Sequence, residues 1–249
     1  MVGLCGFHPK FVDDLRPRLE NHLCGPSLLP NLRSIKFQLW EDQPQIIEIL
    51  SLLPAGLRDL DLHIGCKTDA EKILQCFASI PLNHLEDVQI LYSNRIAIDP
   101  VTMGAFLRPN RATLADLNLR ETPRTVSALK QLETFPRLKR LRATHQGAAS
   151  ELPEFFDLIG SSFPRLRSTV IQLDEAITEE VPAAAFEGLA ACRELQSVCL
   201  NTRRWTSLSR EDVHRFGSWW PLMEKFSLSY GYYPDQAMTP LGILEDFAR

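Results

Sequence analysis

Aspartate recurs at nearly constant intervals in the first half of the chain. Asp59, Asp87 and Asp116 are 28 and 29 residues apart, and Asp61 stands two positions after Asp59. Two carboxylates at i and i+2 on a β-strand would lie on the same face and could mimic a general acid and base. That chemistry needs a pocket that drives the two pKa values apart, whereas the surrounding sequence indicates an open face.

A basic stretch follows this series of aspartates. Residues 120–142 contain two acidic residues, Glu121 and Glu133, against seven basic ones: Arg120, Arg124, Lys130, Arg137, Lys139, Arg140 and Arg142. The stretch has two interpretations, a patch that contacts phosphate groups or the charges left exposed around a buried strand. The formal net charge of −4 and the pI of 5.9 argue against a dedicated nucleic-acid-binding domain, because such domains carry a clear positive excess.

The sequence lacks the motifs of common enzyme classes. It contains no nucleophile elbow, no zinc-protease helix motif, no phosphate-binding loop and no dinucleotide-binding glycine pattern. Its six cysteines form no C-x-x-C pair and have no histidine pair at zinc-ligand spacing beside them. We therefore expect no catalytic residues, no metal site, no cofactor and no enzymatic activity.

The composition is that of an ordinary globular domain. The chain has 249 residues, of which 45% are hydrophobic and 23% are charged, which supplies ample material for a core. No apolar run approaches the roughly 18 residues that a membrane helix needs, and the first residues do not form a signal peptide. Scattered cysteines without an N-glycosylation sequon favour a reducing compartment, so we expect a cytoplasmic or nuclear protein without membrane contact.

The aspartates and the basic stretch share one repeating frame. The pattern L-x-x-L-x-L, with other residues at some positions, begins at Leu32, Leu57, Leu85, Leu114, Leu138, Leu166, Leu195 and Met223. Successive starts are 24 to 29 residues apart. A period in this range indicates a solenoid, in which each unit buries its apolar face against the next. The sixth copy carries Thr169 in place of a large apolar residue, which leaves its register open to a shift by one.

Segments with helical periodicity separate the frames. Thr68 and Glu71 form a capping box before the apolar face of residues 68–80, and Asp99 before Pro100 is a typical helix start. Further helices are expected at 45–53, 125–135 and 183–191, and after Pro153 and Ser209. One strand and one helix per repeat predict an α/β solenoid with about eight repeats.

This pattern resembles the leucine-rich repeat family, in its longer, helix-containing subclass, over about residues 29–230. The resemblance implies a curved arc with a parallel sheet on the concave side and helices on the convex side. The asparagine that the family usually carries three places after the last frame residue is missing, which predicts an irregular arc. We expect one domain over residues 1–249: an N-terminal helical cap (1–28, with an amphipathic helix at 11–23), repeats (29–230) and an incomplete C-terminal repeat (231–249).

Three segments resemble the degenerate repeats of fungal F-box/leucine-rich-repeat proteins: LLPNLRSIKF (28–37), FPRLKRLRA (135–143) and FPRLRS (163–168). In such proteins an N-terminal F-box recruits a ubiquitin-ligase adaptor and the repeats hold the substrate. Residues 1–28 do not read as an F-box. The resemblance therefore implies adaptor recruitment only if an F-box is present outside this chain.

Residues between the inward frame positions are expected on the concave face, because side chains alternate along a strand. The acidic residues of repeats two to four then abut the arginines of the fifth repeat. The two groups either neutralise each other or form a bipolar surface that selects a charged partner. The predicted partner-binding residues are Asp59, Asp61, Asp87, Gln89, Tyr92, Asp116, Asn118, Arg120, Arg140, Arg142 and His145.

Hypotheses of different classes follow from these patterns. The first is a protein-interaction module that binds a protein on its concave face, as the substrate-recognition part of an F-box-type ubiquitin-ligase receptor. The alternatives are a nucleic-acid binder that uses the basic patch at 120–142, and a structural fragment without an independent function.

Overall fold

The computed structural model describes residues 2–5, 31–41, 53–67, 70–80, 82–92, 99–119, 129–130, 134–173, 177, 181–202 and 208–230. Within these residues one parallel sheet contains nine strands, and their order in space is their order in the chain. The strands are β1 (Val2–Cys5), β2 (Ser34–Glu41), β3 (Asp59–Lys67), β4 (Asp87–Tyr92), β5 (Asp116–Leu119), β6 (Arg140–His145), β7 (Ser168–Leu173), β8 (Ser197–Thr202) and β9 (Lys225–Tyr230). This open sheet confirms the predicted α/β leucine-rich-repeat solenoid.

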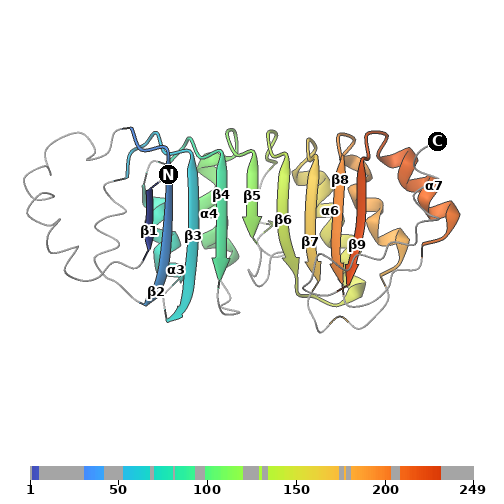
Figure 1. Ribbon diagram of the computed structural model, residues 1–249, viewed down its shortest axis with the longest axis horizontal. Helices are drawn as coiled ribbons and strands as arrows, with labels where there is room; N and C mark the ends of the chain where they lie inside the picture. The colour runs from blue at the N-terminus through green and yellow to red at the C-terminus, as the bar shows by residue number, and fades with distance from the viewer. Residues whose placement is uncertain are drawn as a thin grey trace, which may run out of the picture.

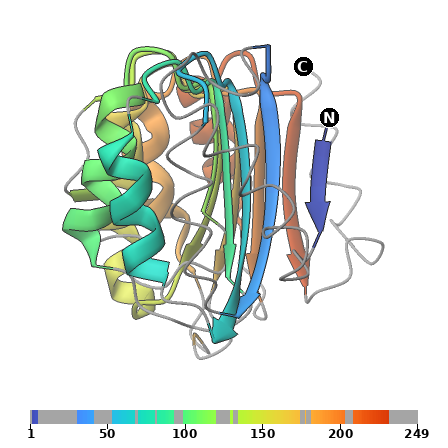
Figure 2. The same cartoon turned by 90° about the vertical axis from the view of Figure 1, so that its left-hand side faces the viewer.

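Within the described residues, helices follow β3, β4, β6, β7 and β8 and cover one face of the sheet (Figure 1). They are α3 (Ala70–Ser79), α4 (Pro100–Leu107), α6 (Leu152–Ser162) and α7 (Arg210–Trp219), with the 3-10 helices η1 (Arg108–Asn110), η2 (Ala149–Glu151) and η3 (Ala183–Ala191). The first and last strands lie farther from the helices than the central strands do (Figure 2). The helices therefore occupy the convex side, and the opposite face of the sheet is concave.

One backbone arrangement recurs at the entry to each strand from β3 to β9. The carbonyl of Arg58 accepts the N–H groups of Glu86 at 2.7 Å and Asp87 at 3.1 Å, so that one repeat holds the start of the next. The same two-fold acceptance recurs at the carbonyls of Arg33, Arg58, Glu86, Ala115, Lys139, Arg167 and Gln196. These bonds set the register although the family's asparagine is missing. The predicted irregularity is confined, within the described strands, to a register shift between Leu39 and Glu41.

The eight predicted frames each begin two residues before a strand, from Leu32 before β2 to Met223 before β9. Their inward residues form a continuous core, in which Leu60, Val88 and Leu117 are neighbours on successive strands and are at most 2% exposed. Aromatic rings extend this core between repeats. Phe77 of α3 contacts Phe37 and Phe106 with ring centroids 6.3 and 6.0 Å apart.

Several helix starts follow the predicted capping chemistry. Asp99 accepts the N–H of Thr102 at 3.1 Å at the start of α4, and Ser209 and Asp212 form a capping box before α7. Residues 183–191 are helical as predicted, but they form the 3-10 helix η3. Thr68, residues 45–52 and most of 125–133 lie outside the described residues, so the predictions made there stay predictions.

The N-terminus contains a strand that the sequence analysis did not predict. Val2–Cys5 pair in parallel with β2, and Val2 is in register with Ile35. The prediction of a purely helical cap over 1–28 is therefore wrong for these residues, because a strand satisfies the backbone groups along the edge of β2. The helix predicted at 11–23 and the incomplete repeat predicted at 231–249 lie outside the described residues.

The sixth repeat keeps its register in spite of its polar frame residue. Thr169 is aligned with Leu141 of β6 and Val198 of β8, and it is fully buried. Among the described residues its hydroxyl has no hydrogen-bond partner. The entry bonds from Lys139 to the start of β7 hold the strand in register, so a polar side chain occupies a core position.

We predict that Thr169→Val raises the free energy of unfolding by about 1 kcal/mol, because valine keeps the shape and removes an unsatisfied buried hydroxyl. The matched control Thr113→Val should lower it by about 1 kcal/mol, since Thr113 Oγ1 donates to the Leu85 carbonyl. Urea unfolding followed by circular dichroism measures both changes. An equal loss of stability in the two variants would contradict the prediction.

Candidate functional site

Two rows of polar side chains cross the concave face. Neighbouring strands of a sheet are about 4.8 Å apart, so residues in register on successive strands form a contiguous row. The first row is acidic and ends in an arginine, and the second row lies two residues farther along each strand. The first row is Asp59, Asp87, Asp116 and Arg140; the second row is Lys36, Asp61, Gln89, Asn118 and Arg142.

A bidentate ion pair joins the last aspartate of the first row to the arginine beside it. Arg140 Nε donates to Asp116 Oδ1, and Arg140 Nη2 donates to Asp116 Oδ2 at 2.7 Å. The hydrogen bonds to Asp116 are the main cause that raises the pKa of Arg140. Since the Arg140 side chain is 67% exposed, the pair contributes little to stability, but its planar geometry fixes where both charges lie.

Asp87 lies between two other carboxylates in the first row. Asp59 is its neighbour on β3 and Asp116 its neighbour on β5. Burial raises the pKa of Asp87, and repulsion from Asp116 and Asp59 raises it further, while Arg140 opposes the shift. The pKa of Asp59 is also raised, by burial and then by Glu86. The first row therefore concentrates negative charge beyond what Arg140 offsets.

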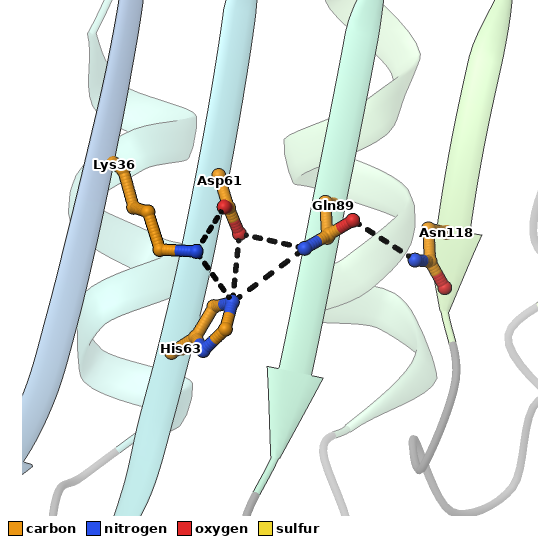
Figure 3. A network of polar contacts seen from close by, with 5 residues as sticks. All are labelled: Lys36, Asp61, His63, Gln89 and Asn118. Atoms are coloured by element: carbon orange, nitrogen blue, oxygen red, sulfur yellow. Dashed lines mark hydrogen bonds and ion pairs between the residues drawn. The ribbon is translucent and has the colours of Figure 1, made fainter. Parts of the chain in front are cut away.

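Hydrogen bonds and an ion pair join the side chains of the second row on β2–β5 (Figure 3). Lys36 Nζ lies 2.7 Å from Asp61 Oδ2. Gln89 Nε2 donates to Asp61 Oδ1 at 3.0 Å, and Asn118 Nδ2 donates to Gln89 Oε1 at 3.1 Å. The amide groups thus carry one polar chain across four strands, which holds each side chain in a defined orientation.

His63 lies two residues after Asp61 on β3 and contacts the same side chains. Its Nε2 lies 3.1 Å from Asp61 Oδ1, 3.2 Å from Lys36 Nζ and 3.5 Å from Gln89 Nε2. An Nε2 that carries a proton donates to Asp61, whereas a bare Nε2 accepts from Lys36 or Gln89. Either tautomer keeps the imidazole within the second row's polar chain.

Uncharged side chains continue both rows on β7 and β8. Ser168 and Ser197 follow Arg140 in the first row, and Val170 and Cys199 follow Arg142 in the second. All four are partly exposed. The concave face therefore has an acidic part on β3–β5, an arginine strand at β6 and a neutral part on β7 and β8.

The structure brings together most of the residues predicted for the site. Those that lie on the concave face are Asp59, Asp61, Asp87, Gln89, Asp116, Asn118, Arg140 and Arg142. Arg120 lies outside the described residues. Tyr92 ends β4 in register with Ile64, and its side chain lies outside the described part of the structure. The role of these residues in binding a partner stays a prediction.

The placement of His145 on the concave face is wrong. His145 is in register with Leu173 and is fully buried, because the alternation that turns Arg140 and Arg142 outward turns residue 145 inward. Its Nε2 lies 3.1 Å from the Ala148 carbonyl, and its ring packs on Phe155 at 5.1 Å. Its Nδ1 is buried and has no hydrogen-bond partner among the described residues.

The sequence analysis missed one residue of the second row and one residue that contacts it. Lys36 stands between the inward residues Ile35 and Phe37 of the first frame, and His63 stands two positions after Asp61. Both follow from the alternation rule that located the aspartates. The sequence therefore contains the signal for their outward placement, whereas their contacts with Asp61 depend on side-chain conformation.

The basic stretch at 120–142 does not form a single patch in the described residues. Lys130 pairs with Glu154 of α6 at 2.8 Å, whereas Arg140 pairs with Asp116 on the concave face. Arg137 and Lys139 precede β6 in the turn, and Arg142 lies in the second row. The charges therefore belong to different surfaces, as expected of residues left exposed around a core strand.

Searches for other kinds of site give no positive result within the described residues. No group of three or more histidine, cysteine or acidic side chains is placed to hold a metal ion. In the same part of the chain no helix has the length and apolar character needed to cross a membrane.

Comparison with known proteins adds a likeness among solved structures. No family model matches the sequence, and no curated protein matches it. The fold is similar to that of the leucine-rich repeat-containing protein LegL7 from Legionella pneumophila, with a TM-score of 0.39 and 13% sequence identity over 99% of this chain and 98% of that one. The fold class, an α/β solenoid like that of leucine-rich repeats, rests on the strand order and register of the chain's own sheet.

We predict that Asp87→Asn raises the free energy of unfolding at pH 7 by about 0.2–1 kcal/mol, because like charges opposite each other in a sheet are destabilising. Because the pKa of Asp87 is raised in the folded state, ionisation of Asp87 destabilises the fold as the pH rises above the pKa of the unfolded state. The stability gained by Asp87→Asn should therefore shrink as the pH falls toward 3. The control is Glu224→Gln, an exposed carboxylate before β9 that should change little. A loss of stability in Asp87→Asn would contradict the prediction.

A pH dependence is predicted for His145, whose pKa is lowered mainly by burial. The unfolded state then binds the proton more readily, so the stability present above about pH 6.5 is lost as the pH falls, by at most about 1.4 kcal/mol per pH unit. His145→Gln should flatten the dependence between pH 7 and 5, while the exposed control His214→Gln should not. Urea titrations across this range test the prediction, and equal slopes for His145→Gln and the unsubstituted chain would refute it.

Proposed function

We propose that this protein is a non-catalytic interaction module whose protein partner binds to the concave face. The observation that carries this proposal is the pair of contiguous polar rows on β2–β6, held in place by bonds between neighbouring strands. A rigid platform loses little conformational freedom when a partner binds, so its contacts are available for affinity and orientation.

The charge distribution favours a protein partner over a nucleic acid. A phosphate backbone would face the carboxylates of Asp59, Asp87 and Asp116 on the same surface that carries Arg140 and Arg142. Nucleic-acid binding depends on neutralising phosphates with basic side chains, which a row of aspartates opposes. The basic-patch hypothesis is therefore the second choice.

The geometry also supports binding over catalysis. The Asp61–His63 contact at 3.1 Å is the arrangement that most resembles a catalytic pair. Among the described residues the imidazole's other contacts are Lys36 and Gln89, so these contacts include no hydroxyl or thiol that the pair could activate. The first row likewise presents carboxylates to solvent without a partner nucleophile.

A finer proposal is that the concave face holds the substrate of an F-box-type ubiquitin ligase. It is supported by the resemblance of residues 28–37, 135–143 and 163–168 to repeats of that class, and adaptor recruitment would require an F-box outside this chain. A cytoplasmic or nuclear location belongs to the same proposal, and the free thiols of Cys76, Cys192 and Cys199 fit a reducing compartment.

Site-specific photo-crosslinking tests the proposed function. A photoreactive amino acid at Val170 or Ser197 samples the concave face without altering its charges, and one at the exposed Glu187 of η3 samples the convex side as a matched control. In cells that express the protein we expect protein adducts from Val170 and Ser197 and none from Glu187. Adducts from Glu187 alone would refute the proposal, and nuclease-sensitive adducts would favour the alternative. Adaptor and cullin-type subunits recovered with the adduct would support the finer proposal.

A further inference from the structure

We propose that the concave face selects the order of charges in its partner: positive charge opposite β3 and β4, and negative charge opposite β6. The inference deepens the proposed function and rests on it, because it states which chemistry a protein segment must present to this surface. Some charged side chains of the concave face are paired with an oppositely charged neighbour, and we call these charges compensated. Others have no such partner among the described residues, and we call these charges open.

The compensated charges lie at two places in the rows. Asp61 is paired with Lys36 at 2.7 Å and also accepts from Gln89. Asp116 is held by both nitrogen donors of Arg140. A partner that competes for either pair must first break bonds that the surface already makes, so these four charged side chains position their neighbours more than they recruit a ligand.

The open charges have opposite signs and lie on different strands. Within the described residues Asp87 makes no ion pair or hydrogen bond, and its neighbours in the first row are carboxylates. Arg142 is exposed and is flanked in the second row by Asn118 and Val170, neither of which is charged. Asp59, at the end of the first row, is exposed and adds to the negative side.

The spacing of these charges defines the partner segment. The strands β4 and β6 are two strand spacings apart, or about 10 Å, which an extended peptide covers in about three residues. A segment that runs across the strands can therefore place a basic side chain over Asp87 and Asp59 and an acidic side chain over Arg142. The small residues Ser168 and Ser197 beyond β6 leave room for the segment to continue.

The electrostatics of the first row support this choice of sign. The pKa of Asp87 is raised by burial and by two neighbouring carboxylates, so an incoming ammonium or guanidinium group relieves existing repulsion. The open charges are partly or fully exposed, and such pairs contribute modestly to affinity. Their main effect is to favour one alignment of the partner over others.

Two synthetic peptides of identical composition test the proposal on the full chain. In the segregated peptide three threonines separate a pair of lysines from a pair of glutamates, and in the alternating peptide lysine and glutamate take turns. We expect the segregated peptide to bind about fivefold more tightly at low salt, as two exposed ion pairs allow, and the preference to fade as salt is added. Fluorescence polarisation measures both affinities.

Variants that neutralise Asp87 or Arg142 test whether these open charges cause the preference for the segregated peptide. Asp87→Asn and Arg142→Gln should each abolish it, whereas the controls Glu224→Gln and Arg165→Gln, which change exposed charges in the turns before β9 and β7, should retain it. Equal affinities, no measurable binding of either peptide, or a preference that survives both neutralisations would overturn the proposal.

The crosslinking experiment separates this failure from failure of the proposed function. Protein adducts at Val170 together with equal peptide affinities would leave the concave face as the binding surface and remove the charge order. Adducts from Glu187 alone would remove the binding surface itself, and the charge order would fall with it.

Discussion

The rest of this structure depends on one backbone contact, the carbonyl that accepts two N–H groups at the entry to each strand from β3 to β9. At the carbonyls of Arg58, Glu86 and Ala115 it ties the start of one strand to the repeat before it. Since all strands are parallel and enter at the same level, residues at equal distances from the entry become neighbours. The rows of the concave face and the layers of the core are both consequences of this backbone register.

Register brings like charges together as readily as it brings opposite ones. It places Asp87 between two carboxylates, and it places Lys36 beside Asp61 and Arg140 beside Asp116. The sheet tolerates the repulsion because core burial on its other face, not surface electrostatics, holds the strands together. Surface charges that fold stability does not require are available for recognition, and the concave face concentrates them on β3–β6.

Polar residues within the core show how firmly the register is held. Asn110 is buried and satisfied, because its Oδ1 accepts the N–H of Leu85 at 2.9 Å and so links two repeats. Thr169 and His145 are equally buried, yet each has a polar atom without a partner among the described residues. Slipping by one residue would expose these groups but would invert every side chain of the strand, a far larger loss than one unsatisfied atom.

The sequence by itself determined the solenoid, the eight frames and the concave-face placement of eight of the eleven residues predicted to bind a partner, because these depend on two local periodicities, the repeat length and the alternation along a strand. It did not determine strand β1, since four residues without a frame carry too little pattern. Nor did it determine that β6 extends to His145, which places this side chain on the inward side. Only the tertiary structure decided that Arg140 binds Asp116 and that Lys36 and Gln89 hold Asp61, which leaves Asp87 and Arg142 open. The physical reason is that such pairings depend on side-chain conformations between residues 24 to 28 positions apart, whereas a linear pattern specifies only which face each residue occupies.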